Sequence, residues 1–538
     1  MSGDGSSALD GEALTGLTAS GRSPSGSSMR FRSVLVALTA LTAVSSAAPA
    51  TAQSIGRQMD LLKLEQQAAE TISALVDSDF KACEAKLPDL RTIINDPRFD
   101  RMRSEVRRPF LFSVILCSEI KDRPLGLAAA RKLEPIAVEP MEIGAVQTIQ
   151  ISEALERDAM ADATRRFLKL MDAQPEVVAG WRPGMINAFT DYLDDDPDLA
   201  LTALQRITTF AWTDPQSLRA SRNEWGLAYG SQLGDRGKAA DAAKAVAQAD
   251  ETRVMMYIAA DRRFSAAWAT PGRFDWTALE EASLTRARAD MEARPETLAP
   301  VREVMSSLRA LGRYDEAIQV GEAFRARLQD GEEFQDAGEQ GDWILILLGH
   351  SYLDTGKVKE AEAAFDEAIG SSDDAEPSTD ARINWAGRLL DLARPKDVLK
   401  VLDGIDRDYV TPYGEAWIDS QRACAQSDTD AGAAAATLDS LRKTRKENPG
   451  ALSQALICNN KLDEAAELLI WRLKTPEHRA GALDPFWVSK APPFVPPWLA
   501  EFERRRQALL ARPDVRAALD KVGRPVTTPL AGDYWGGF

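Results

Sequence analysis

Four cysteines and two histidines are the side chains of this sequence that could most readily bind a metal, form a crosslink or act as nucleophiles. Cys83 and Cys117 lie 34 positions apart, and Cys424 and Cys458 are separated by the same 34 positions. None of these residues forms a CxxC, HxxxH or HExxH pattern, in which zinc ligands lie close together. We therefore expect no metal and no cofactor. The shared spacing indicates crosslinks, a repeat length or chance.

Other candidate catalytic groups have simpler structural interpretations. His350 follows a glycine inside a helical pattern, which favours a structural role. The segment "GDRGKA" at 234–239 lacks the G-x4-G-K-[ST] spacing of a phosphate-binding loop and is typical of a turn between helices. In "DYLDDDPDLAL", we expect Asp196 to cap a helix that begins with Pro197. A pair of distant carboxylates, as in glycoside hydrolases, stays open as an alternative without a supporting motif.

The N-terminus carries a targeting pattern. Residues 1–28 are rich in Gly and Ser, and we expect them to be disordered and to precede the true start site. Residues 29–52 resemble a secretory signal peptide: Arg30 and Arg32 precede a short apolar run, and an A-x-A site predicts cleavage after Ala52. We therefore predict a periplasmic or secreted protein of a Gram-negative cell envelope. No later apolar run is long enough to predict an integral membrane segment.

The charge of the chain limits its partners. The 65 basic and 82 acidic residues give a net charge of −17, and removal of the signal peptide and upstream residues leaves this value unchanged. An acidic chain repels nucleic acid and anionic membrane surfaces, and no basic patch with interleaved aromatic residues is present in the sequence. We therefore expect no nucleic-acid partner, and basic or neutral partners are favoured.

Helix-length segments separated by short Gly, Asp, Asn or Pro turns dominate the mature chain, and strand patterns are almost absent. The clearest pair of helices, at 343–369, reads "WILILLGHSYLDTGKVKEAEAAFDEAI". Its pattern-forming residues are Leu348, Gly349, Tyr352, Ala361, Phe365 and Ala368. The Leu-Gly-x2-Tyr and Ala-x3-Phe spacings resemble the tetratricopeptide repeat (TPR). Two departures are an early tryptophan and a missing closing proline.

Weaker copies extend the resemblance over about 300–475, with Ala317 and Ala465 in the phase of a second helix. Ala361 and Ala465 are 104 positions apart, close to three TPR periods. Ala317 and Ala361 are 44 apart, so we expect an insertion of about ten residues in "QDGEEFQDAGEQGD". The resemblance implies an all-α fold: a right-handed solenoid of TPR-like hairpins with a C-terminal capping helix and an irregular tail.

Two interruptions and a change of composition suggest the domain limits. The segment "INDPRFDRM" ends the second helix of the mature chain. The segment "AADRRFSAAW" resembles the Asp-x-Arg-Phe closures that often follow TPR arrays in bacterial proteins. We predict a divergent helical-hairpin array over 53–270, a TPR-like array over 271–475 and a Pro-rich, aromatic capping segment over 476–538. The aromatic residues of that segment are expected to dock on the last repeat or to be offered to a partner.

Placed on this repeat, the cysteines favour two disulfide bonds. Cys83 falls near the start of a second helix and Cys117 near the end of the next first helix, so antiparallel packing brings them level. Cys424 and Cys458 fall near the ends of two successive first helices. An exported protein with an even number of cysteines favours this chemistry. The alternative is four small buried apolar side chains.

The resemblance implies a function without catalysis. The concave face of TPR arrays binds peptides or protein segments, so we predict a non-catalytic, exported scaffold with a protein or peptide partner. One alternative is a helical superhelix that binds carbohydrate or peptidoglycan through exposed tryptophans, of which the chain has twelve. Another is an enzyme with dispersed carboxylates near His350 or His478.

Overall fold

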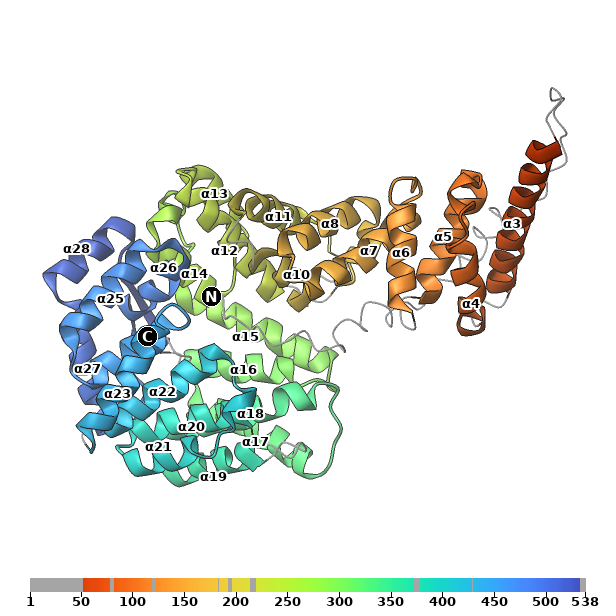
Figure 1. Ribbon diagram of the computed structural model, residues 1–538. Helices are drawn as coiled ribbons and strands as arrows, with labels where there is room; N and C mark the ends of the chain where they lie inside the picture. Colours follow the sequence, from red (N-terminus) through yellow and green to blue (C-terminus); the bar gives the residue numbers. More distant parts are fainter. Residues whose placement is uncertain are drawn as a thin grey trace. The chain divides into compact units, whose positions relative to one another are not determined.

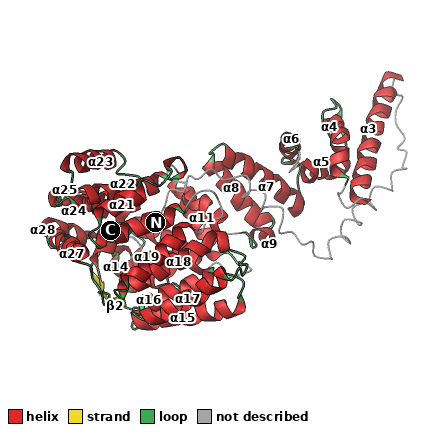
Figure 2. Ribbon diagram, turned by 90° about the horizontal axis from the view of Figure 1, so that it is seen from below, coloured by secondary structure: helices red, strands yellow, loops and turns green. Residues whose placement is uncertain are grey.

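The computed structural model describes residues 52–77, 82–118, 122–181, 183–191, 196–212, 219–370, 378–427 and 429–532. The predicted upstream segment and signal peptide lie outside the described residues, except for Ala52, where the first described helix begins. The described part of the chain is almost entirely helical (Figure 2), as an all-α solenoid requires.

The described residues form two compact units that divide between Ser221 and Arg222. We call these units the N-terminal array and the C-terminal array. The division lies earlier than the boundary predicted at residue 270, because the segment before that boundary packs with the end of the chain. The backbone of Asp261, for example, pairs with that of Gly523 in an antiparallel bridge.

In the N-terminal array, helices pack mainly against their neighbours in the chain, as in a row of hairpins (Figure 1). Contacts between α3 and α5, and between α5 and α7, identify these as first helices of successive hairpins. The described elements are α3 (Ala52–Asp77), α4 (Cys83–Ile94), η1 (Phe99–Arg101), α5 (Ser104–Ser118), α6 (Arg123–Leu133), α7 (Pro140–Glu156), α8 (Met160–Ala173), α9 (Pro175–Val178), α10 (Pro183–Asp191) and α11 (Pro197–Thr209). Asp196 caps α11 as predicted, since its side chain accepts a hydrogen bond from Leu199 N at 3.1 Å.

The C-terminal array continues the hairpin pattern, with α12 spanning the division. Its helices are α12 (Arg219–Asp235), α13 (Ala239–Ala245), α14 (Thr252–Ala260), η2 (Arg262–Ala267), α15 (Trp276–Ala293), α16 (Ala299–Ala310), α17 (Tyr314–Gln329), α18 (Ala337–Asp354), α19 (Val358–Gly370), α20 (Thr379–Asp391), α21 (Pro395–Leu402), η3 (Arg407–Tyr409), α22 (Pro412–Gln426), α23 (Ala431–Lys443), α24 (Pro449–Cys458) and α25 (Leu462–Lys474). The closing elements are α26 (Pro476–Leu483), η4 (Asp484–Phe486), β1 (Trp487–Lys490), α27 (Pro497–Leu510), α28 (Pro513–Val522) and β2 (Val526–Ala531). Contacts between α16, α18, α20, α22 and α24 identify them as the first helices of this array.

The hairpin of α18 and α19 shows how small residues let two helices approach. A Cβ atom on Gly349 would lie 2.6 Å from Cε2 of Phe365, so only glycine fits there without a shift. The Phe365 ring stacks on Trp385 of α20 at 4.7 Å between centroids, which connects this hairpin to the next. Gly356 closes the turn with φ of +77°, a conformation that glycine adopts without strain. The other residues that define the repeat pattern are also buried: Leu348, Tyr352, Ala361, Ala368, Ala317 and Ala465.

The segment in which we expected the insertion lies between α17 and α18. It forms a loop and the first turns of a long α18. Phe334 of the loop is buried against Phe324, and the Arg327 guanidinium lies over both rings at 4.7 and 4.6 Å. The Asp336 carboxylate accepts hydrogen bonds from the backbone N–H groups of Leu298 and Ala299, at 2.7 and 2.9 Å. The inserted segment therefore caps the start of α16.

Ion pairs between successive hairpins repeat at the spacing of one hairpin. In the N-terminal array, seven pairs join residues 31 to 34 positions apart: Arg91–Asp122, Lys132–Asp100, Arg123–Glu156, Arg166–Glu134, Arg108–Glu142, Arg165–Asp196 and Arg206–Asp172. Two further pairs have other separations, 38 for Arg103–Glu65 and 22 for Arg131–Glu153. In the C-terminal array, Arg394 pairs with Glu362 at a separation of 32. Across the insertion the separation grows to 42, between Arg325 and Glu367. Each exposed pair contributes little, about 0–1 kcal/mol, but the set reports the repeat length directly.

The Asp-x-Arg-Phe sequence folds in the same way in both arrays. Asp96 accepts hydrogen bonds from the backbone N–H and the guanidinium of Arg98, and Asp261 accepts the same bonds from Arg263. In each copy the phenylalanine is fully buried. The Arg98 guanidinium lowers the pKa of Asp96 to about 2, so the Asp96 carboxylate is ionised at neutral pH. The motif turns the chain sharply after a helix.

The end of the chain packs back on the start of the C-terminal array. Strands β1 and β2 pair in parallel, and β2 contacts α14, α15 and α16; Figure 2 labels β2 near α14 and α16. Arg524 donates from its backbone N to Ala260 O at 2.9 Å and from Nε to Ala259 O at 2.8 Å, and its guanidinium lies 4.0 Å from the Trp268 ring centroid. The described end of the chain thus contains a strand, β2, whose only hydrogen-bonded partner strand in the described chain is β1. The tail that we expected to be irregular, "DYWGGF", lies outside the described residues.

Both cysteine pairs lie at disulfide distance. Cys83 and Cys117 have a Cα–Cα distance of 5.0 Å and join α4 to α5. Cys424 and Cys458 have a Cα–Cα distance of 5.5 Å and join the first helices α22 and α24. These are the helix contacts predicted from the repeat phase, and the distances fall in the usual range of about 4.4–6.8 Å.

Substitution of Gly349 by Ala tests the close contact in the best-defined repeat. The added methyl group must displace the buried Phe365 ring, and we expect the free energy of unfolding to fall by about 1–3 kcal/mol. Gly338→Ala on the same helix is the matched control, because a Cβ atom there meets nothing within 4 Å. The control should leave stability unchanged or raise it by up to about 1 kcal/mol. Equal effects in denaturant titrations would contradict the packing described.

Stepwise reduction tests the two disulfides. Cys83 is partly exposed, whereas Cys424 and Cys458 are buried, so mild reductant should open Cys83–Cys117 first. Alkylation of the unfolded, unreduced exported protein should label no thiol, and four after full reduction. Loss of either 34-residue loop closure should lower the free energy of unfolding by about 3–4 kcal/mol. Free thiols in the unreduced protein, counted by mass spectrometry, would contradict the pairing.

Candidate functional site

Buried polar side chains gather on the first helices of the C-terminal array. They come from α16, α18, α20, α22 and α24: Ser307, Arg309, His350, Ser351, Asp354, Asp391, Ser420, Gln421 and Ser453. Among the described residues, the matching second helices α17, α19, α21 and α23 bury apolar side chains and no charged ones, and α25 contributes Arg472. Buried polar groups require partners, so this row is where specific chemistry or specific docking is expected.

Two buried ion pairs dominate the row. Arg309 donates from Nη2 to Asp354 Oδ2 at 3.0 Å, and both side chains are only 6% exposed. Arg388 pairs with Asp391 at 2.9 Å on α20. Such pairs recover the cost of removing charges from water only when both partners are present, so loss of one partner is far more harmful than replacement of both.

The burial of these groups changes their protonation. Burial raises the pKa of Asp391 to about 6, against the opposing effect of Arg388. His350 lies one turn before Asp354, and burial together with the nearby Arg388 and Arg309 holds its pKa well below the usual range. Its ring meets Phe365 edge-on at 5.3 Å. His350 is therefore neutral at neutral pH, and its setting is that of a packed core residue.

The C-terminal segment lies across the ends of these first helices. The backbone N of Phe494 donates to Asp354 O at 3.0 Å, and Arg505 Nη1 of α27 donates to Cys458 O at 2.6 Å. Both acceptors are carbonyl groups at helix C-termini, which have no partner within the helix. A cation at such a terminus is favoured by the helix dipole. Helix α27 also contacts α20, α24 and α25.

We expected the first helices to line an open binding face, but in the C-terminal array this segment covers some of their ends. Over α18, α20 and α24, the chain's own residues 494–510 cover the ends of the first helices. Two aromatic residues of the segment dock back on the array: Trp487 packs against Tyr257 at 4.8 Å, and Phe494 packs against the core cluster that contains Tyr352 and Leu353. The last aromatic residues, Tyr534 and Trp535, lie outside the described residues.

The N-terminal array, in contrast, exposes apolar side chains. Six of the nine large hydrophobic residues that are exposed in the described chain belong to it: Met59, Leu62, Leu116, Val138, Met141 and Val177. Met59 and Leu62 are 53% and 51% exposed and lie three residues apart on α3, so they share one face of that helix. Four of the six lie on the first helices α3, α5 and α7.

The features that would favour the alternative functions are not gathered in the described residues. Within those residues, no three His, Cys, Asp or Glu side chains group as a metal site would need. Of the eleven described tryptophans, five are buried and six are partly exposed. His478 is half-buried and packs against Trp471 at 4.7 Å. The described helices also include none that is long and apolar enough to cross a bilayer.

Removal of one partner from the buried pair tests the ionic row. Arg309→Met leaves Asp354 buried without its cation, and we expect the free energy of unfolding to fall by about 3–5 kcal/mol. Arg313→Met is the matched control: this arginine is 32% exposed and pairs with Glu316 at the surface. The control should cost about 0–1 kcal/mol in denaturant titrations. Similar losses of unfolding free energy for the two variants would show that the buried pair contributes no more to stability than an exposed pair.

Comparison with known proteins adds little to this description. The chain matches no protein-family model and no curated protein. Among solved structures, it is similar to a "Circular tandem repeat protein with novel repeat topology and enhanced subunit contact surfaces", at 12% identity, over 86% of this chain and 98% of that one, with a TM-score of 0.11. At that score the likeness carries no argument, so the fold and the candidate sites rest on the geometry above.

Proposed function

We propose that this chain is a non-catalytic, exported scaffold that binds a protein or peptide segment through its N-terminal array. The observation that carries the proposal is the set of exposed apolar side chains on α3, α5 and α7. Exposed apolar residues on successive repeat units suit an extended partner, since one segment can contact several hairpins in turn.

The division of the chain into two arrays supports this choice of surface. In the C-terminal array, the ends of the first helices α18, α20 and α24 already contact the segment 494–510. In the N-terminal array, α3 contacts α4 and α5 of its own array, and Met59 and Leu62 remain exposed. Burial of each such side chain on binding would contribute about 1.5–3 kcal/mol before the costs of association.

Export and charge complete the proposal. The signal-peptide pattern and the two cysteine pairs at disulfide distance suit an oxidising compartment outside the cytoplasm. The net charge of −17 favours a partner whose contact surface is basic or neutral around an apolar centre. A segment with spaced apolar side chains and flanking Lys or Arg fits both requirements.

Site-specific photo-crosslinking in the producing cell tests the proposal. A benzoylphenylalanine at Leu62 should give a discrete protein adduct, which Met59→Glu should reduce at least about tenfold, because a charge cannot be buried in an apolar contact. A benzoylphenylalanine at Val488, which is 53% exposed in the C-terminal array, is the matched control. It should give no such adduct, and Val488→Glu should not affect crosslinking at position 62.

Two outcomes would reject the proposed function. One is the absence of a discrete protein adduct at position 62 together with retention of the folded chain on peptidoglycan or polysaccharide. The other is an adduct at Val488 alone, which would place the partner on the C-terminal array. Circular dichroism of each variant before crosslinking ensures that lost adducts reflect lost contact rather than lost fold.

A further inference from the structure

Helix α3 has a buried side and an uncovered side. The buried side packs in the core of the N-terminal array through Leu64, Ala68, Ile72 and Leu75. On another side, six residues follow one another at alternating spacings of three and four, and none of them is buried: Met59, Leu62, Gln66, Ala69, Ser73 and Val76. We call this set the α3 stripe. A period of 3.5 residues is the pattern by which one α-helix packs along another.

The α3 stripe fits a helix better than an extended strand. Four of its six residues are apolar, and Ala69 in the middle is small enough to let the axis of a second helix come close. From Met59 to Val76 the helix rises about 26 Å, so a helix of similar length along α3 contacts the whole stripe. A strand has a side-chain period of two, which does not match this spacing.

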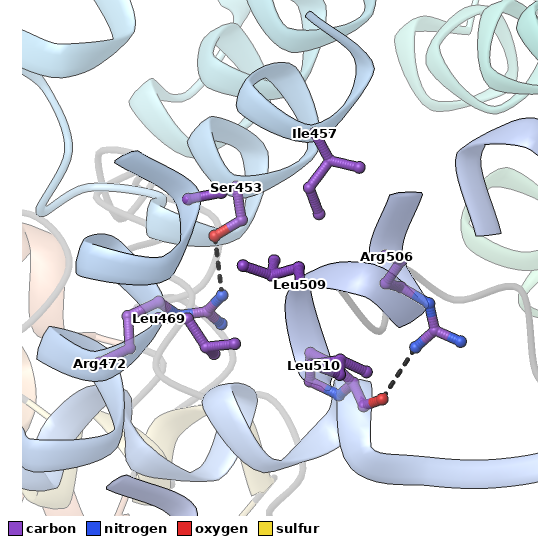
Figure 3. A pocket seen from close by; sticks show the side chains of 9 residues that line it. Ser453, Ile457, Leu469, Arg472, Arg506, Leu509 and Leu510 are labelled. Carbon is purple, nitrogen blue, oxygen red and sulfur yellow. Dashed lines mark hydrogen bonds between the residues drawn. The ribbon is translucent and has the colours of Figure 1, made fainter. Parts of the chain in front are cut away.

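A cavity borders the stripe where α3 meets the end of α4 and the turn that follows. Its walls include Asp60, Lys63, Leu64, Ile93, Asp96 and Arg98, and Lys63 lies one helical turn after Met59. The free space is ≈ 150 Å³. A second cavity, between α24, α25 and α27, has only ≈ 10 Å³ and is lined by Arg472 and Leu509 among others (Figure 3). Of these two cavities, the one at α3 has room for a side chain from a partner.

The chemistry of the α3 cavity suits a long basic side chain. Leu64 and Ile93 are buried and offer an apolar contact to the methylene groups of Lys or Arg. The Asp60 side chain is 55% exposed, and the cation within ion-pairing distance of it in the described chain is Lys63, at 4.0 Å. Ile93 belongs to the last turn of α4, and carbonyl groups at a helix C-terminus favour a cation.

Two cations of the protein line the same cavity, and both leave Asp60 accessible. Arg98 is committed to Asp96, since its Nε and Nη2 donate to that carboxylate at 2.9 and 2.6 Å. The Lys63 side chain is 74% exposed, so its ammonium group can turn to solvent when another cation approaches Asp60. The net charge of −17 attracts a basic segment at longer range.

We propose that the partner contacts α3 as a basic amphipathic α-helix, with its apolar side along the α3 stripe and one Lys or Arg side chain in the cavity beside Asp60. This inference rests on the proposed function and specifies the chemistry of the partner at α3. Helix α5 packs on the first helices α3 and α7, whereas α3 packs on α5 alone among the described first helices. The partner helix supplies the neighbour that α3 lacks.

Photo-crosslinking along α3 in the producing cell tests the helical contact. Benzoylphenylalanine at Gln66 and at Ser73 should each give an adduct of the same mass as the adduct at Leu62, because a helix that lies along α3 passes all three positions. A strand that crosses α3 near Met59 would give the adduct at Leu62 without the other two, and this result would overturn the inference.

Substitution of Asp60 by Asn tests the cavity. We expect the yield of the Leu62 adduct to fall at least about threefold, because the basic side chain loses its counter-charge. Asp89→Asn is the matched control: it removes the same charge from a side chain of α4 that is 51% exposed, and should leave the yield unchanged. Lys63→Gln should keep or raise the yield, since it removes a cation that competes for Asp60. Circular dichroism confirms that each variant is folded.

The outcomes separate this inference from the proposed function. Equal yields for Asp60→Asn and Asp89→Asn, or a loss of yield in Lys63→Gln as large as in Asp60→Asn, would overturn the basic helix and leave protein binding by the N-terminal array intact. An adduct with twice the mass of the chain would identify a second copy as the occupant and would also overturn the inference. Absence of adducts at Leu62, Gln66 and Ser73 would reject the inference together with the proposed binding surface.

Discussion

A helical hairpin buries one side of each helix within itself and depends on neighbours to cover the rest, so the ends of any hairpin array must be covered or must bind something. The C-terminal array covers its ends with its own chain. Strand β2 packs on α14, α15 and α16, and the Arg524 backbone and guanidinium satisfy carbonyl groups at the end of α14. The N-terminal array keeps Met59 and Leu62 exposed on α3. This contrast is the physical basis for our proposal that the N-terminal array binds a partner.

The same constraint explains the polar character of the C-terminal first helices. Their C-terminal ends carry carbonyl groups that need donors, and the Phe494 N–H and the Arg505 guanidinium supply them from the closing segment. The buried Arg309–Asp354 pair ties α16 to α18 next to this contact. Buried pairs of this kind add little net stability, but they disfavour any packing that separates the two charges. They therefore favour one register of α16, α18 and the closing segment.

Local patterns in the sequence were sufficient to predict the local structure. The hairpin over 343–369, the Asp196 cap and the helix contacts of both cysteine pairs all depend on residues within about one repeat of each other. The closure of the C-terminal array could not be predicted in this way, because it joins Arg524 to Ala259 across 265 positions. The strand β2 contains a proline, and its partner residue Trp487 in β1 lies 39 positions before Val526, so the pairing is not local in the sequence.

The candidate sites were harder to predict than the fold. Asp354 stands at the end of a helix and Arg472 near the end of another, positions where charged side chains are usually solvated. The closing segment contributes to their burial: the Phe494 N–H bonds to Asp354 O, and α27 packs on α25. The exposure of Met59 and Leu62 was equally hidden, since an apolar pair at helical spacing is more often part of a core.

Amide hydrogen exchange of the full chain tests the central claim, that the C-terminal array is closed by its own terminal segment. The N–H groups of Phe494 and Arg524 bond to Asp354 O and Ala260 O, at 3.0 and 2.9 Å. We predict that both exchange at least about 100-fold more slowly than in an unstructured peptide, in step with the helices they contact. Exchange of these two amides at the rate of free peptide, with α18 and α14 protected, would show that the segment is undocked and would contradict the account.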